Sequence, residues 1–80
     1  MEQKTADKHD IEAGRILRAL REQRRVTQTE LADASGITFQ QIQKYERGVN
    51  RISLSRLFQM CKALRIKPAT FISEVAKCVK

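Results

Sequence analysis

Two helix-start signals stand close together in this chain, one on each side of Gly36. Residues 27–30, Thr-Gln-Thr-Glu, form a capping-box pattern, in which the threonine hydroxyl and the glutamate carboxylate each bind a free backbone N–H at the start of a helix. Residues 38–41, Thr-Phe-Gln-Gln, repeat the pattern with glutamine in the closing position. Gly36 can adopt the left-handed conformation that ends a helix. The chain is therefore constrained to two short helices joined by a tight turn.

The flanking segments also show helical signals. Asp10 is a candidate N-cap for a first helix that Val26 closes, and Ser53 is a candidate N-cap for a fourth. Pro68 suits the first turn of a fifth helix, because its missing N–H has no partner there. The apolar stripes of these helices fall at Ile11, Ile16, Leu17 and Leu20, then at Leu54, Leu57, Met60, Cys61 and Leu64, then at Phe71, Ile72, Val75 and Val79. With no alternation of period two, the sequence predicts an all-α fold of five helices, with helices two and three as a helix-turn-helix.

The length of 80 residues allows one domain. We expect residues 1–9 to form a flexible polar tail and residues 10–80 to form the domain, with the helix-turn-helix motif at 28–47. No apolar run approaches the roughly 18–20 residues of a membrane helix, and the polar start does not resemble a secretory signal. These features predict a cytoplasmic protein with no membrane partner.

The charge balance favours an anionic partner. Sixteen Lys and Arg against nine Asp and Glu leave a net charge of +7, which attracts nucleic acid. The alternative is that a mixed charged surface serves solubility alone. The basic residues are spread along the chain, which is more typical of a folded binding face than of a disordered basic tail.

Catalysis and metal binding find no support in the residue pattern. Cys61 and Cys78 lack metal-ligand spacing, and the single histidine, His9, falls in the predicted tail. Isolated glycines cannot build a phosphate-binding loop. We expect no enzyme activity, no metal, no cofactor and no small-molecule ligand.

The predicted third helix presents a polar face suited to DNA. Ile42 and Tyr45 share its apolar side, whereas the polar side carries Gln40, Gln41, Gln43 and Lys44. Glutamine can bind the N6 and N7 edge of adenine in the major groove, and Lys44 can reach a guanine or a phosphate. A merely solvated helix face is the alternative interpretation.

The stretch from Thr27 to Gly48 resembles the helix-turn-helix of the phage repressor and Cro proteins, the XRE family. The resemblance extends upstream through Gly14 and residues 17–21, and downstream from Leu57 to Phe71. It implies base reading by Phe39, Gln40, Gln41 and Lys44, and phosphate contacts by Thr27, Gln28, Thr38, Gln43, Arg47, Asn50 and Arg51. It also implies a buried pair between Arg21 of the first helix and Glu46 of the third. The loop lacks the proline often found after it, and Phe39 can either touch a thymine methyl or pack against the protein.

The resemblance implies a bacterial or phage protein, associated with the nucleoid, that regulates transcription by binding double-stranded DNA. Repression is the commoner outcome in such proteins. A palindromic operator read by a homodimer is expected, because one recognition helix covers few base pairs. On the fifth helix we assign Phe71 and Val75 to the core, and Ile72 with Val79 to an exposed apolar dimer interface, the alternative being that this strip packs on the first helix. The rival functions are a protein-interaction module, an antitoxin-type adaptor of a toxin–antitoxin pair, and a binder of structured RNA, whose deep major groove a helix reads poorly.

Overall fold

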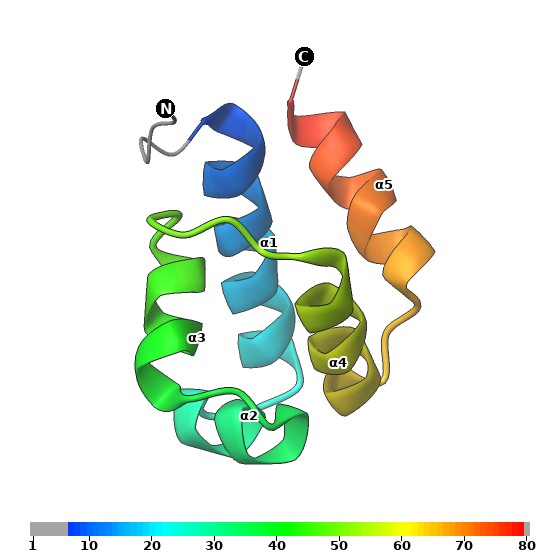
Figure 1. The fold of residues 1–80 in the computed structure, drawn as a ribbon. Coiled ribbons are helices and arrows are strands. Elements are labelled where there is room, and N and C mark those ends of the chain that lie inside the picture. The colour runs from blue at the N-terminus through cyan, green and yellow to red at the C-terminus, as the bar shows by residue number, and fades with distance from the viewer. Residues whose placement is uncertain (1–6, 80) are drawn as a thin grey trace.

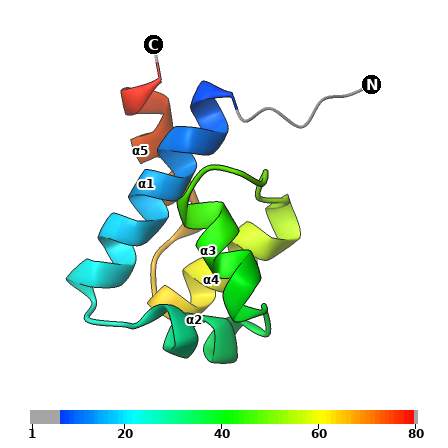
Figure 2. The ribbon, with the colours of Figure 1, turned by 90° about the vertical axis from the view of Figure 1, so that its left-hand side faces the viewer.

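A computed structural model describes residues 7–79, which contain five helices and no strand. The helices are α1 (Lys8–Gln23), α2 (Gln28–Ser35), α3 (Phe39–Glu46), α4 (Leu54–Leu64) and α5 (Pro68–Cys78). Figures 1 and 2 show α1 packed between α3 on one side and α5 on the other, with α2 across the end of the bundle. The predicted all-α fold is confirmed.

The core lies where the five helices meet. Leu17 of α1, Leu31 of α2 and Ile42 of α3 are fully buried, and Phe71 anchors α5 against them. The rest of the buried apolar set is Ala32, Ile37, Tyr45, Leu57, Met60, Cys61, Leu64 and Ile66. Helices α2 and α3 are too short to be stable alone, so this shared core holds them in place.

The helix starts follow the local signals with one exception. At α2 the capping box is complete: Glu30 N–H donates to Thr27 Oγ1 at 3.0 Å and Thr27 N–H donates to Glu30 Oε1 at 2.8 Å. Ser53 caps α4, and Pro68 begins α5, as predicted. At α3 the Thr38 hydroxyl accepts from the Gln41 N–H, but the return bond does not form. The predicted second capping box is therefore only half present.

Helix α1 begins three residues earlier than predicted. Asp7 is its N-cap: Asp7 Oδ1 accepts from the Asp10 N–H at 3.0 Å, and Asp10 Oδ2 accepts from the Asp7 N–H at 3.4 Å. Asp10 thus closes the box instead of capping, because aspartate can fill the place usually held by glutamate. The prediction of a flexible tail is wrong for residues 7–9, and residues 1–6 lie outside the described part of the chain.

Four helices end in the same way. The N–H of Val26, Ile37, Val49 or Ile66 donates to the carbonyl five residues before it, and the residue ahead of each has a positive φ. This is the Schellman motif, in which a left-handed residue is followed by an apolar one. Gly36 and Gly48 fill the left-handed position after α2 and α3, both at φ 72°. After α1 and α4 the position is filled by Arg25 at φ 58° and Arg65 at φ 60°.

Two features of the packing depart from the sequence interpretation. Leu54, assigned to the stripe of α4, is 71% exposed, because the first turn of α4 projects beyond the core. Val26 belongs to the connection after α1, which ends at Gln23.

Gly14 is buried where α1 crosses α3, and a Cβ there would collide with the Tyr45 carbonyl oxygen and lie 2.9 Å from the Glu46 carbonyl oxygen.

Candidate nucleic-acid interface

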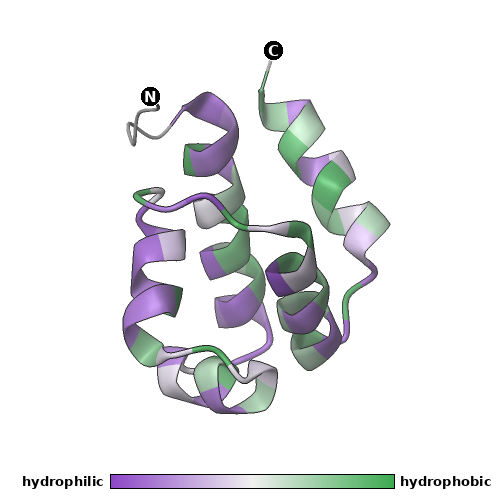
Figure 3. Ribbon diagram, in the orientation of Figure 1, coloured by the Kyte–Doolittle hydropathy of each residue, from purple (hydrophilic) through white to green (hydrophobic). Residues whose placement is uncertain are grey.

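The outer face of α3 is polar and open to solvent. Gln40 and Lys44 lie one turn apart on it, both exposed, and their side chains form no hydrogen bond with the described residues. Figure 3 shows α3 mostly in the hydrophilic colour. Phe39, at the first position of the helix, is 39% exposed and adds an apolar edge to this face. These three side chains are free to contact a ligand without rearrangement.

Gln41 is oriented by the protein itself. Its side-chain amide nitrogen lies 3.1 Å from the hydroxyl of Tyr45, one turn further along α3. Tyr45 is buried, so the contact draws the Gln41 side chain toward the core, and Gln41 is half-buried. The amide oxygen of Gln41 is left as its outward polar atom.

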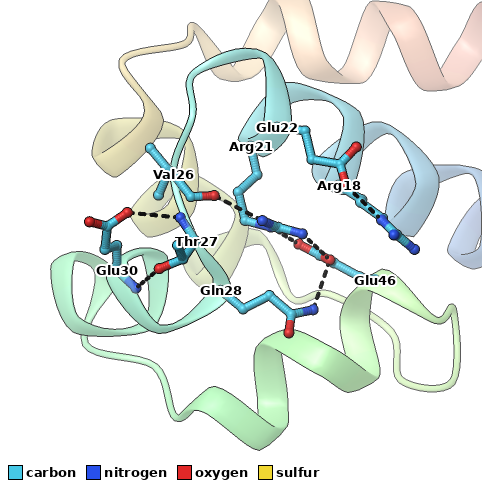
Figure 4. Close-up of polar contacts among 8 residues, drawn as sticks. All are labelled: Arg18, Arg21, Glu22, Val26, Thr27, Gln28, Glu30 and Glu46. Atoms are coloured by element: carbon cyan, nitrogen blue, oxygen red, sulfur yellow. Dashed lines mark hydrogen bonds and ion pairs between the residues drawn. The ribbon is translucent and has the colours of Figure 1, made fainter.

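A charged network joins α1, α2 and α3 beside this face (Figure 4). Arg21 donates from Nε to Glu46 Oε2 at 2.6 Å and from Nη2 to Glu46 Oε1 at 3.0 Å. Its Nη1 donates to the Val26 carbonyl at 2.8 Å, so one guanidinium fixes both α3 and the turn before α2. The hydrogen bonds from Arg21 to Glu46 hold the pKa of Arg21 above its usual range.

Gln28, the first residue of α2, completes the network. Its Nε2 donates to Glu46 Oε1 at 3.0 Å. One amide hydrogen is thereby used, and the second remains for a ligand. Sequence reasoning missed this contact, because no short-range signal relates residue 28 to residue 46.

The network forms the floor of a polar hollow between α1, α2 and α3. Its rim is formed by Arg18, Gln43 and Arg47, with Thr27 and Gln28 at the start of α2. Arg18 is paired with Glu22 at 3.1 Å, whereas Arg47 is exposed and forms no ion pair within residues 7–79. Cationic side chains next to free backbone N–H groups at a helix start favour the binding of an anion there.

The loop after α3 is attached to the start of α1. Arg51 lies with Nε 3.3 Å from Asp10 Oδ2 and with Nη2 3.7 Å from Asp7 Oδ2. The pKa of Asp7 is lowered by the Asp10 backbone N–H and, to a lesser extent, by the charge of Arg51. Asn50 is half-buried in the same loop. Arg51 is still largely exposed, so its guanidinium is accessible beside its carboxylate partners.

An apolar surface lies on the far side of the molecule from α3. Ile72 is 49% exposed and Val79 is half-buried, and both line a groove between the ends of α1, α4 and α5. Leu54 lines the same groove, and Phe58, one turn further along α4, is 57% exposed. The sequence interpretation assigned Leu54 to the core stripe because of its helical spacing, and it did not single out Phe58. We call Leu54, Phe58, Ile72 and Val79 the α4–α5 apolar surface.

In the described range, no helix is both long and apolar enough to span a bilayer. Nor does that range contain a group of three His, Cys, Asp or Glu side chains placed to hold a metal ion.

Comparison with known families gives a match over most of the chain. The family described as Helix-turn-helix matches residues 17–71. An uncharacterized HTH-type transcriptional regulator, y4wC, of Sinorhizobium fredii is 42% identical over 71 residues, which cover 89% of this chain and 50% of the relative. An uncharacterized transcriptional regulator in the ATPase CF(0) region of Rhodospirillum rubrum is 44% identical over 68 residues, covering 85% and 63% of the two chains. The chain spans about half the length of the first of these curated relatives.

Solved structures share most or nearly all of this fold. The clp gene regulator ClgR from C. glutamicum superposes with a TM-score of 0.84 at 29% identity, over 95% of this chain and 97% of that one. The restriction-modification controller protein C.AhdI from Aeromonas hydrophila gives a TM-score of 0.74 at 31% identity, over 76% and 92%. Both are similar to this chain in fold and, at these identities, in sequence.

Proposed function

Because the chain belongs to the helix-turn-helix family of the XRE type, we propose that it binds double-stranded DNA as a transcriptional regulator, with α3 in the major groove. The observation that carries the proposal is the face of α3. Gln40 and Lys44 are exposed and unengaged there, beside the polar hollow at the start of α2. Such a face can read base edges while the hollow accepts a phosphate.

The roles divide according to what each side chain is free to do. Gln40 and Lys44 read bases, and Phe39 contacts a thymine methyl from the first turn of α3. Gln41 offers its amide oxygen, which suits a base-edge donor such as the amino group of adenine or cytosine. Thr27, Gln28, Thr38, Gln43, Arg47, Asn50 and Arg51 contact phosphates, partly through backbone N–H groups at the helix starts.

The DNA-binding unit is a homodimer on a palindromic operator. Two recognition helices double the number of base pairs read, and the two-fold axis of the dimer matches that of the site. The α4–α5 apolar surface supports this assembly, because several large apolar side chains exposed together on a small protein mark an interface. It also lies away from α3, so pairing through it leaves both recognition helices open (Figure 1).

Repression is the regulatory outcome we propose, by occlusion of a promoter in the bacterial or phage nucleoid. The second candidate is a protein-interaction module or antitoxin-type adaptor, in which the α4–α5 apolar surface receives a different protein. Its exposed Leu54 and Phe58 are the observation in favour of that alternative.

Selection of bound sequences from a random DNA pool tests the proposal. We expect an enriched palindrome whose half-sites lie about one helical turn apart. The control is the double variant Q40A/K44A, which keeps the fold because both side chains are exposed. It should enrich the palindrome much more weakly and lose the preference at the positions that Gln40 and Lys44 read. If the wild-type protein enriches no sequence, and heparin competes equally with every duplex, the proposed function is rejected.

A further inference from the structure

The four Schellman motifs of this fold differ in one respect that the fold does not require. Two of them carry glycine at the left-handed position, and two carry Arg25 and Arg65. A left-handed conformation is sterically unfavourable for an L-residue, whereas glycine adopts it freely. Backbone strain of this kind tends to persist where the side chain serves a function.

The two arginine-bearing turns are neighbours in space. Arg24 Nε donates to the Leu64 carbonyl at 2.5 Å, which joins the end of α1 to the end of α4. Both turns lie at the end of the bundle that α2 crosses (Figure 1). The bond joins the turn that carries Arg24 and Arg25 to the turn that carries Arg65, with Lys67 two residues further along the chain. These four exposed cations are called the turn cluster.

The turn cluster is free of carboxylate partners. Within residues 7–79, no ion pair joins a carboxylate to the cluster. Asp7 pairs with His9 and Arg51, and Asp10 pairs with Arg51. The carboxylates of Glu12, Glu22, Glu46 and Glu74 pair with Arg15, Arg18, Arg21 and Lys77, and Asp33 forms no ion pair in this range. Glu30 is engaged in the capping box of α2. A set of cations without counter-charges on a small domain concentrates positive potential.

We propose that the turn cluster is a second DNA contact, which binds phosphates that flank the operator. The inference rests on the proposed function. DNA is favoured over an acidic protein because Arg25 lies only two residues before Thr27, which lines the polar hollow at the start of α2. The planar guanidinium fork of arginine also matches a phosphate in two hydrogen bonds.

The test compares two duplexes that carry the same selected operator, one of about 20 and one of about 40 base pairs, so that only the longer offers phosphates beyond two half-sites. The variant is R25G/R65G, which gives both turns the residue already present after α2 and α3. The charge-matched control is K8A/K77A, which removes two cations from elsewhere on the surface. Binding is measured as a function of salt, and melting temperatures are measured for all three proteins.

We expect the wild-type protein and K8A/K77A to show a steeper dependence of log affinity on log salt with the longer duplex. R25G/R65G should lose about 0.9 of slope for each phosphate contact removed, with the longer duplex only. Its melting temperature should equal or exceed that of the wild-type protein, because glycine relieves both left-handed residues.

Three results overturn the inference. If R25G/R65G keeps the wild-type slope on both duplexes, the cluster does not contact DNA. If the variant instead loses only binding to a polyglutamate peptide, the partner of the cluster is an acidic protein. If the wild-type protein binds neither duplex, the proposed function fails together with this inference, which distinguishes that case from the first two.

Discussion

Arg21 and Glu46 are joined by two hydrogen bonds, of 2.6 and 3.0 Å, across the crossing of α1 and α3. Their side chains are only 11% and 3% exposed. The same carboxylate also receives the amide of Gln28, so the pair fixes the position of the α2 start relative to α3. The geometry of the proposed DNA-binding face therefore depends on one buried ion pair.

Removal of one partner of this pair should destabilise the fold. Glu46→Ala leaves the Arg21 guanidinium without its carboxylate in a largely buried place, which should lower the free energy of unfolding by about 3–5 kcal/mol. The matched control is Glu22→Ala, which breaks the exposed pair with Arg18 and should cost about 0–1 kcal/mol. Urea unfolding measures both. Equal midpoints for the two variants would contradict the structural role of Glu46.

A single methyl group at the α1–α3 crossing should also separate these helices. Gly14→Ala places a Cβ against the backbone carbonyls of Tyr45 and Glu46, which cannot rotate away. We expect a loss of about 1–3 kcal/mol from overpacking, together with weaker operator binding. Gly36→Ala is the control, because no atom lies within 4 Å of its added Cβ and only its φ of 72° is strained. Thermal melts measure the stability of both variants. Operator titrations should show weaker binding for Gly14→Ala alone.

The next prediction concerns the sequence specificity of the outer face of α3. Gln40→Ala should cost about 1–3 kcal/mol of operator affinity and relax one base position, because its amide is free to bind a base. Tyr45→Phe removes only the hydroxyl that holds Gln41 and should change the preference at the position that Gln41 reads, with little effect elsewhere. Parallel selections from a random DNA pool measure both. An unchanged operator preference in Gln40→Ala would reject the orientation proposed for α3.

The α4–α5 apolar surface predicts how dimerisation can be abolished. Ile72→Glu or Phe58→Glu places a charge in the proposed interface and should give monomers in sedimentation experiments. Loss of the second half-site contact should weaken operator binding by about 10²–10⁴-fold. Thr70→Glu, at an exposed position on the same helix α5, carries the same charge outside this surface and should stay dimeric. Dimers that survive both substitutions would place the interface elsewhere.

Acid should loosen the start of α1. The folded state lowers the pKa of Asp7 from its ordinary value of 3.8, so the carboxylate is the form that the fold stabilises. This contribution is fully present above the unfolded value and is lost as the pH falls through the lowered pKa. Hydrogen exchange of the Asp10 amide should accelerate in that range relative to Asp7→Asn, whose cap does not titrate. Identical pH profiles in the two proteins would contradict the cap.

The sequence by itself determined where most helices begin and end. The capping box at residues 27–30, Ser53, Pro68 and Gly36 act on backbone groups within one turn of themselves, so they can be recognised without knowledge of the fold. For α1 the sequence predicts a start three residues too late, because an aspartate such as Asp10 can be either the N-cap or the closing residue of a capping box, and the local pattern does not distinguish the two.

The tertiary structure decided which side chains are available. Leu54 repeats at core spacing but is exposed, because burial depends on where the neighbouring helices end and not on periodicity. The side-chain amides of Gln28 and Gln41 donate to Glu46 and Tyr45, whereas the amide of Gln40 has no such partner. All three residues are glutamines, so residue type alone does not predict which amide is free. Local backbone signals are short-range and survive in the sequence, but side-chain partners are set by helix crossings, which exist only once the core has formed.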